Sequence, residues 1–303
     1  AQGQTALIVD VGGTTTDITL IRDGAPVIRE EGMVIGSWRT HVQAVEMYTV
    51  GLGGDSLTTL DASGHFTLGP ARVMPLCQAH LHAKSPVLDI LRDPESWIGP
   101  DLAAQCVALA PGVRPGDDPI STWLAANGPA TPAQLRQELG LAESSLDKTI
   151  ARLQAGRKII ACGFTPTDAL HVLGTLHLGE TAPARRGAGV LAARLGLAPD
   201  TFCSRVLEQA SQTIATTILT ALSNREVGPA LAQFVTRPEP NPLLDIAIRL
   251  KAPVIGIGAA APFLLPAVAK SLGTTVAFPD HFAVGNAVGA ALMDRPQLTT
   301  NQG

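Results

Sequence analysis

The segment from Asp10 to Asp17 has the residue types and spacing most suited to chemistry in this chain. An apolar run ends in Asp10, and a Gly-Gly-Thr-Thr-Thr turn leads to Asp17 and a second apolar run. Glycines let backbone amides approach an anion, threonines add hydroxyl donors, and two acids can hold a hydrated Mg²⁺. The structural alternative is a tight polar hairpin turn. The candidate phosphate-binding residues are Gly12, Gly13, Thr14, Thr15 and Thr16.

Two further glycine-rich segments have the composition of ligand-binding loops. The first precedes a predicted hairpin, and its candidates are Gly53, Gly54, Asp55 and Ser56. The second lies between a predicted strand and a predicted helix, whose positive end favours phosphate or ribose oxygens. Its candidates are Gly256, Gly258, Ala259 and Ala260. The structural alternatives are a bulged hairpin entry for the first segment and close strand-to-helix packing for the second.

Two other groups of polar residues could carry chemistry. Asp168 stands at the start of a helical pattern, where it can face a cleft or simply stabilise the first turn. Cys77, His80 and His82 offer three zinc ligands in a short span, but no second cluster at finger-like spacing accompanies them. Chance proximity is the simpler interpretation of that group. The sequence has no Gly-x-Ser-x-Gly elbow.

Four segments carry a family resemblance. Residues 9–18 resemble the phosphate motif of the actin/sugar-kinase/Hsp70 ATPase superfamily. More narrowly, they resemble the Asp-x-Gly-Gly-Thr-Ser/Thr-Thr-Asp signature of the hydantoinase/oxoprolinase family, of the hydantoinase A-like type. Later segments resemble motifs of the same family in the same order, at 49–57, 165–174, and 256–262 together with 284–289. The resemblance covers both ends of the chain and leaves out its middle.

The resemblance implies an α/β, ribonuclease-H-like lobe of an actin-like ATPase, with ATP and Mg²⁺ as cofactors. In that family ATP activates a cyclic amide by phosphorylating its carbonyl oxygen, and water then opens the ring. Carried over, Asp10 and Asp17 position Mg²⁺ or the attacking group, and Asp168 is a third catalytic candidate. The three glycine segments would contact the nucleotide. Phosphoryl transfer chiefly requires positioning and charge neutralisation, which such loops supply. The alternatives are a small-molecule kinase of the same superfamily and a non-catalytic nucleotide-binding or assembly module.

The sequence departs from the family pattern in two respects. Asp55 stands where the family usually has a third glycine, which adds a metal or ribose contact or signals a changed substrate. Family members normally carry two glycine-rich phosphate motifs, one in each lobe, whereas this chain has one, followed by motifs of the second lobe. We therefore expect a second ATPase lobe that needs a first lobe or a partner subunit to complete its site.

The composition is that of a globular protein with a sizeable core. Of 303 residues, 46% are hydrophobic and 16% are charged, and the net charge is −4. The chain therefore lacks the excess of basic residues that would predict binding to nucleic acid or to an anionic membrane. Four scattered cysteines and the lack of a signal-peptide pattern predict reduced thiols and a cytoplasmic protein. The uncharged stretch 252–269 is interrupted by prolines, so it predicts a strand, a turn and a short helix rather than a membrane span.

Strands are expected at both ends of the chain. Residues 5–35 predict three successive strands, the third from Pro26 to Ile35, and a second hairpin follows at 58–60 and 65–68. A strand at 254–257, a helix at 259–272, a strand at 274–278 and a helix at 281–293 close the chain. Three more helices are expected at 167–178, 187–195 and 199–224.

The middle of the chain predicts an inserted, mainly helical subdomain. Thr131 caps one helix and Ser144 or Ser145 caps the next, whose apolar face is Leu146, Ile150 and Leu153. With a following strand these helices resemble a partial winged helix, but their basic residues are few, which favours a packing or lid role over DNA binding. The predicted division is a first part of the ATPase lobe at 1–76, the insert at 77–162 and a second part at 163–303.

Overall fold

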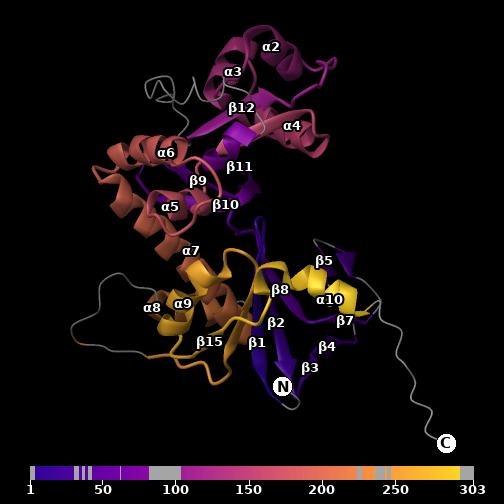
Figure 1. The fold of residues 1–303 in the computed structure, drawn as a ribbon, viewed down its shortest axis with the longest axis vertical. Helices are drawn as coiled ribbons and strands as arrows, with labels where there is room; N and C mark the ends of the chain where they lie inside the picture. The colour runs from indigo at the N-terminus through magenta and orange to yellow at the C-terminus, as the bar shows by residue number, and fades with distance from the viewer. Residues whose placement is uncertain are drawn as a thin grey trace, which may run out of the picture. The chain divides into compact units, whose positions relative to one another are not determined.

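The protein has a mixed α/β fold, shown here as a computed structural model (Figure 1). The structure describes residues 4–30, 34–35, 38–39, 43–61, 63–81, 104–223, 227–235, 243 and 247–293. The chain divides into two compact units, one of Ala1–Val50 with Ser211–Gly303 and the other of Gly51–Ala210. Within the described ranges, no helix has both the length and the apolar character needed to cross a membrane.

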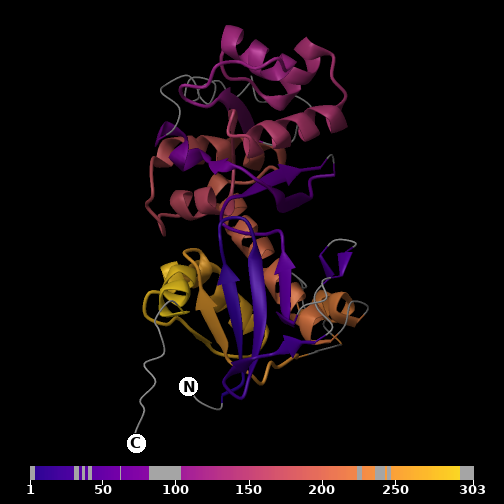
Figure 2. The same ribbon diagram turned by 90° about the vertical axis from the view of Figure 1, so that its right-hand side faces the viewer.

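A six-stranded mixed sheet organises the first unit (Figure 2). Strands β1 (Ala6–Val11) and β2 (Thr16–Arg22) form the predicted antiparallel hairpin. On one side β14 (Val254–Ile257) runs parallel to β1, and β15 (Val276–Ala277) runs parallel to β14. Strands β3 (Ala25–Pro26) and β8 (Met47–Val50) pair with β2. Apolar residues of β1, β2 and β14 lie in the core, which explains why these strands could be predicted.

The prediction of one long third strand is wrong. After β3 the chain continues in two-residue strands, and each pairs with a different partner. These are β4 (Ile28–Arg29) with β7 (Ala44–Val45), and β5 (Val34–Ile35) with β6 (Trp38–Arg39). Val27 N still donates to Leu20 O of β2 at 3.0 Å, and after this residue the chain pairs with β7 instead of β2.

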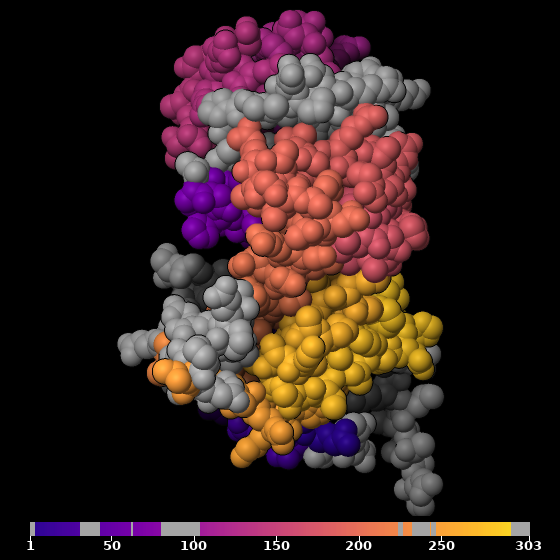
Figure 3. All heavy atoms as spheres, turned by 90° about the vertical axis from the view of Figure 1, so that its left-hand side faces the viewer, coloured from indigo at the N-terminus to yellow at the C-terminus, as the bar shows by residue number. Residues whose placement is uncertain are grey.

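Helices of the first unit pack beside this sheet. They are the later part of α7 (Pro199–Leu222), α8 (Val227–Val235), α9 (Ala261–Ser271) and α10 (Gly285–Met293). Helix α9 contacts both β14 and β1, and α8 was not predicted. The predicted closing helix at 281–293 begins as a 3-10 turn, η3 (Phe282–Val284), preceded by His281 at a φ of 61°. In Figure 3 the segment from α9 to α10 is coloured yellow, and its atoms form one continuous area of surface.

The second unit holds a hairpin, a small sheet and six helices of its own along the described residues. Strands β9 (Ser56–Leu60) and β10 (Phe66–Arg72) form the predicted hairpin. The sheet orders β11 (Met74–Pro75), β13 (Ile159–Gly163) and β12 (Gln105–Leu109), of which β12 was not predicted. The helices are η1 (Leu76–Leu81), α2 (Pro119–Asn127), α3 (Pro132–Leu139), α4 (Glu143–Ala155), α5 (Pro166–Val172) and α6 (Thr181–Arg194). Helix α7 begins in this unit.

Helix ends show which local signals were interpreted correctly. Thr131 caps α3 in a reciprocal capping box with Gln134, as its sequence indicates. The predicted serine cap of α4 is wrong, because α4 begins at Glu143 with Ala142 in the cap position and no side-chain cap. Thr165 caps α5 in a second capping box, with Asp168, and the helix begins at Pro166 and not at the predicted residue 167.

Two helix lengths in the second unit also differ from expectation. Helix α5 ends at Val172, well before the predicted residue 178, and Gly174 adopts a φ of 71° that an L-residue rarely takes. Helix α6 begins at Thr181 rather than at Gly187. A Cβ on Gly187 would lie 2.4 Å from Leu76 Cδ1, so this glycine serves helix packing and does not mark the helix start.

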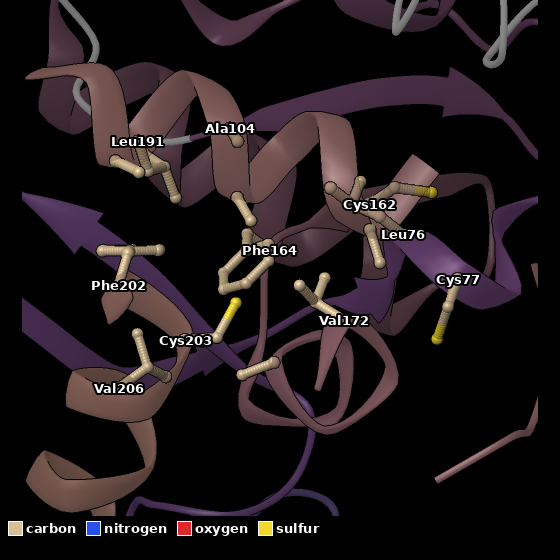
Figure 4. Close-up of a cluster of buried hydrophobic side chains, with 14 of the residues drawn as sticks. Leu76, Cys77, Ala104, Cys162, Phe164, Val172, Leu191, Phe202, Cys203 and Val206 are labelled. Carbon is tan, nitrogen blue, oxygen red and sulfur yellow. The ribbon is translucent and has the colours of Figure 1, made fainter. Parts of the chain in front are cut away.

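The core of the second unit gathers around Phe164 and Phe202, whose ring centroids lie 5.6 Å apart (Figure 4). All four cysteines are buried, and none of them forms a disulfide. This core joins η1, β12, β13, α5, α6 and α7. The compact units change at residues 50 and 210, whereas the predicted boundaries lie at 76 and 162. The three-part division therefore stays a prediction.

Candidate functional site

Strands β1 and β2 place Asp10 and Asp17 directly opposite each other. Their Cα atoms are partners in the antiparallel register. Side chains of such a pair lie on one face of the sheet with Cβ atoms about 5 Å apart, and two like charges in this position repel. The pair therefore needs hydrogen-bond donors or a cation beside it.

Two threonine hydroxyls hold the carboxylate of Asp17. Thr49 Oγ1 donates to Asp17 Oδ1 at 2.5 Å, and Thr15 Oγ1 donates to Asp17 Oδ2 at 3.2 Å. Thr49 lies on β8 and is the Cα partner of Asp17 on the other side of β2. Both oxygens of Asp17 are thus oriented by neutral donors, and neither bond requires a positive charge.

An amide from the end of the described chain holds Asp10. Asn286, in the first turn of α10, donates from Nδ2 to Asp10 Oδ2 at 2.8 Å. The start of α10 lies against β14, because a Cβ added to Gly285 would meet Ile257 Cβ at 3.3 Å. The segment 284–289 therefore contributes a direct polar contact to the acid of the first motif.

The backbone of Gly258 packs directly on the end of β1. Its φ is 94°, and an added Cβ would lie 2.2 Å from the backbone oxygen of Val11 and 2.9 Å from Asp10 Oδ1. No side chain fits there, so this position requires glycine. The following Ala259 and Ala260 lead into α9, and their small side chains leave the start of that helix uncrowded.

Gly256 is explained by packing. A Cβ at this buried position would lie 2.5 Å from Phe278 Cε1 and 2.7 Å from Leu265 Cδ1. The geometry matches the structural alternative of close strand-to-helix packing. A nucleotide contact by Gly256 stays a prediction.

The turn between β1 and β2 is closed by a backbone bond from Gly12 N to Thr15 O at 3.0 Å. Thr14 is exposed at its tip, while Gly12, Gly13 and Thr15 are half-buried. Thr16 is buried within β2. Of the three hydroxyls, that of Thr14 is therefore best placed to meet a ligand.

The segment from Gly53 to Ser56, in the second unit, forms a closed and largely buried turn. Gly53 N donates to Ser56 Oγ at 2.8 Å, and Gly54 O accepts from both the amide and the hydroxyl of Thr167, at 3.0 and 2.8 Å. Asp55 pairs with Arg72 at 3.0 Å. Burial raises the pKa of the Asp55 carboxyl above its usual value, and the opposing effect of the Arg72 guanidinium is smaller.

Asp168 is fully buried and bonded on both oxygens. Its carboxylate accepts from the amides of Leu76 at 3.0 Å, Cys77 at 2.8 Å and Thr165 at 3.0 Å. Burial raises the pKa of the Asp168 carboxyl, and the hydrogen bonds only partly offset this effect, so that the resulting pKa is about 6. The contacts tie η1 to the start of α5 and account for an acid here without chemistry. A catalytic role for Asp168 stays a prediction.

The sequence profile of the hydantoinase/oxoprolinase family matches residues 1–237. The chain belongs to this family. Its fold resembles the nucleotide-free structure of acetone carboxylase, from work on ATP-dependent acetone carboxylation, with 16% identity and a TM-score of 0.53 over 95% of this chain and 29% of that chain. The ATP-dependent caprolactamase from Pseudomonas jessenii matches at 17% identity and a TM-score of 0.43 over 92% of this chain and 28% of that chain. A comparison with curated proteins found no match.

Two contacts of this hydantoinase/oxoprolinase chain were missed by sequence reasoning. Asn286 and Thr49 both lie within family-like segments, but neither is among the site residues that the sequence predicts. Two of the three predicted zinc ligands, the side chains of His80 and His82, lie outside the described residues. Along the part of the chain that is described, no three His, Cys, Asp or Glu residues gather as a metal site.

Proposed function

We propose that this chain carries part of the ATP site of an enzyme that opens a cyclic amide, activating it by phosphorylation of its carbonyl oxygen. The observation that carries the proposal is the convergence on Asp10. Asp17 lies opposite it across the hairpin, Gly258 packs its backbone against it, and Asn286 donates to it. Three family-like segments far apart in the sequence thus meet at one acid, as a ligand site requires and a simple hairpin turn does not.

Asp10 and Asp17 would hold Mg²⁺ in this site. The donor set fits, because Mg²⁺ is usually bound through one or two carboxylates together with phosphate oxygens and waters. Bound there, the ion would neutralise negative charge on the phosphates. Asn286 and Thr49 fix the orientation of the carboxylates and leave further lone pairs on their oxygens, a supporting role typical of groups behind metal ligands.

The turn at residues 12–15 would contact phosphate through its backbone amides and the exposed hydroxyl of Thr14. The beginning of α9 lies beside this turn, because Gly258 touches Val11, and a helix N-terminus favours an anion. We assign the nucleoside to Gly258, Ala259 and Ala260. The β1–β2 hairpin with the parallel β14 and β15 supports a ribonuclease-H-like, actin-like ATPase lobe.

A first ATPase lobe, or a partner subunit, would complete the site. The single Asp-x-Gly-Gly-Thr motif supports this proposal, and the chain spans 29% of the acetone carboxylase chain that it resembles. Stabilisation of a transferring phosphoryl group requires donors around the developing charge and exclusion of water. One lobe supplies donors from one side only, so we expect weak ATP binding and no ring opening by this chain alone.

Calorimetry with Mg²⁺-ATP tests the site. We expect weak binding that Asp10→Asn and Gly13→Val abolish, with melting curves unchanged for Asp10→Asn. Unchanged affinity in both variants would contradict the phosphate assignment. An ATP-consumption assay on this chain together with the proposed first lobe or partner subunit, with hydantoin, 5-oxoproline and sugars, separates a cyclic-amide hydrolase from a small-molecule kinase. Binding without turnover of any of them would favour a non-catalytic module.

A further inference from the structure

A pocket of about 590 Å³ in the second unit takes no part in the proposed ATP chemistry. It lies between the β9–β10 hairpin and α4, and its floor includes the buried side chains of Leu57, Leu146 and Ile150. Its volume is within the range of sites for small molecules, which combine an apolar lining with a few polar groups.

One face of α4 gives the pocket a polarity along its length. Glu143, Asp147, Ile150 and Gln154 line it at spacings of three and four, so they follow one face of the helix. The two acids come first, the apolar residue lies in the middle, and Gln154 ends the row. Gln154 Nε2 donates to the backbone oxygen of Arg72 at 3.4 Å. With a rise of 1.5 Å per residue, Asp147 stands roughly 10 Å along the helix from Gln154, whose side chain contacts the Arg72 backbone.

The acidic end carries an excess of negative charge. Glu143 and Asp147 are four residues apart, a spacing at which like charges destabilise each other. Arg136 Nη1 lies 3.6 Å from Glu143 Oε2, and the same guanidinium also interacts electrostatically with Asp147, so one positive charge faces two carboxylates. Partial burial and the neighbouring Glu143 both raise the pKa of Asp147. A ligand ammonium would relieve this imbalance.

Arg72 also lines the pocket, its backbone meets Gln154 at the other end of the row, and its guanidinium has spare donors. Arg72 donates from Nε and Nη2 to the same oxygen of Asp55, at 3.2 and 3.0 Å. A guanidinium has five N–H donors, and the Arg72 side chain is 62% exposed. Arg72 can therefore donate to a second carboxylate without releasing Asp55.

We propose that this pocket binds a small linear zwitterion, an ω-amino carboxylate. Its ammonium would lie at Asp147, its methylene chain over Leu146 and Ile150, and its carboxylate at Arg72. The two charges match the two ends of the pocket, and the chain matches the apolar stretch between them. The site consists of residues of the second unit and does not depend on the proposed function.

Because Arg72 serves both the pocket and Asp55, the ligand carboxylate would share its guanidinium with the Gly53–Ser56 turn. Removing the charge of Asp55 should therefore strengthen ligand binding. A purely structural role for this ion pair gives no reason for such a gain.

Calorimetry on the full 303-residue chain tests the proposal, with 6-aminohexanoate as the probe and hexylamine and hexanoate as singly charged controls. We expect the zwitterion to bind at least tenfold more tightly than either control. No binding, or equal binding of all three probes, would overturn the proposal.

Variants locate the binding site. Asp147→Asn and Arg72→Gln should each weaken binding about tenfold, and Ala151→Trp should abolish it, because Ala151 is an exposed lining residue whose enlargement fills the pocket. Asp55→Asn should tighten it. Matched controls outside the pocket, Arg152→Gln and Asp200→Asn, should change nothing. Unaltered binding in both Asp147→Asn and Ala151→Trp, or loss of binding in Asp10→Asn, would exclude this pocket as the site.

Discussion

Asn286 donates its side-chain amide to the carboxylate of Asp10 at 2.8 Å, across a separation of 276 residues in the sequence. Asp10 ends the first family-like segment and Asn286 belongs to the last one. The bond passes from the first turn of α10 to a strand at the centre of the sheet. It gives the closing segment a polar contact at the proposed metal-binding acid, in addition to its packing.

Asn286→Ala should weaken Mg²⁺-ATP binding about tenfold with little effect on stability. Asn286 is exposed, and substitutions at such positions usually change the free energy of unfolding by less than about 0.5 kcal/mol. The loss follows from an Asp10 carboxylate that is no longer oriented. Calorimetric titration and a melting curve measure the two quantities. Asn127→Ala is the matched control, because Asn127 makes a local bond to Trp123 O. Equal affinities of Asn286→Ala and the parent chain would disprove the positioning role.

Gly258→Ala should both destabilise the protein and abolish nucleotide binding. The φ of 94° and the 2.2 Å approach to Val11 O leave no room for a methyl group, so β1 and β14 must separate. A cost above roughly 2 kcal/mol is expected from strain and displaced backbone together. Denaturant titration measures it.

Gly289→Ala is the control for Gly258→Ala. An added Cβ at Gly289 meets nothing within 4 Å, and alanine favours a helix over glycine by about 1 kcal/mol. The control should therefore be neutral or stabilising. Equal stability losses in the two glycine variants would show that the contact of Gly258 with β1 is not the cause.

Asp168→Asn should reduce the pH dependence of stability between about pH 4 and pH 6. The folded-state pKa of Asp168 is raised from 3.8 to about 6 by burial. The folded state therefore binds a proton that the unfolded state has lost, and this contribution to stability is complete below the unfolded pKa and lost as pH rises through the folded value. Urea titrations of the variant and the parent across this range measure the difference. A variant whose stability changes in parallel with that of the parent would contradict the assigned shift.

Thr131→Ala should lower the free energy of unfolding by about 1 kcal/mol, because it removes the cap of α3. Ser144→Ala should change it by less than about 0.5 kcal/mol, because Ser144 is exposed in α4 and does not cap that helix. Chemical denaturation of the two variants and the parent chain measures both changes in the free energy of unfolding. A larger loss for Ser144→Ala than for Thr131→Ala would reverse the assignment of caps.

Local signals in the sequence determined several elements correctly. The hairpin around residues 12–15, the β9–β10 hairpin, the helix capped by Thr131 and the long α7 each depend on residues close in the chain. Strict apolar periodicity and a turn or cap are enough to specify such elements. The motif order was likewise sufficient to identify the hydantoinase/oxoprolinase family, which the profile match confirms.

Tertiary structure alone decided which polar residues meet. The contact of Asn286 with Asp10, the contact of Thr49 with Asp17 and the burial of Asp168 against the amides of η1 depend on strand order and on packing between distant segments. No local pattern encodes these distances. The same reason explains the error in the third predicted strand, because residues after Val27 pair with the distant β7 and not with β2.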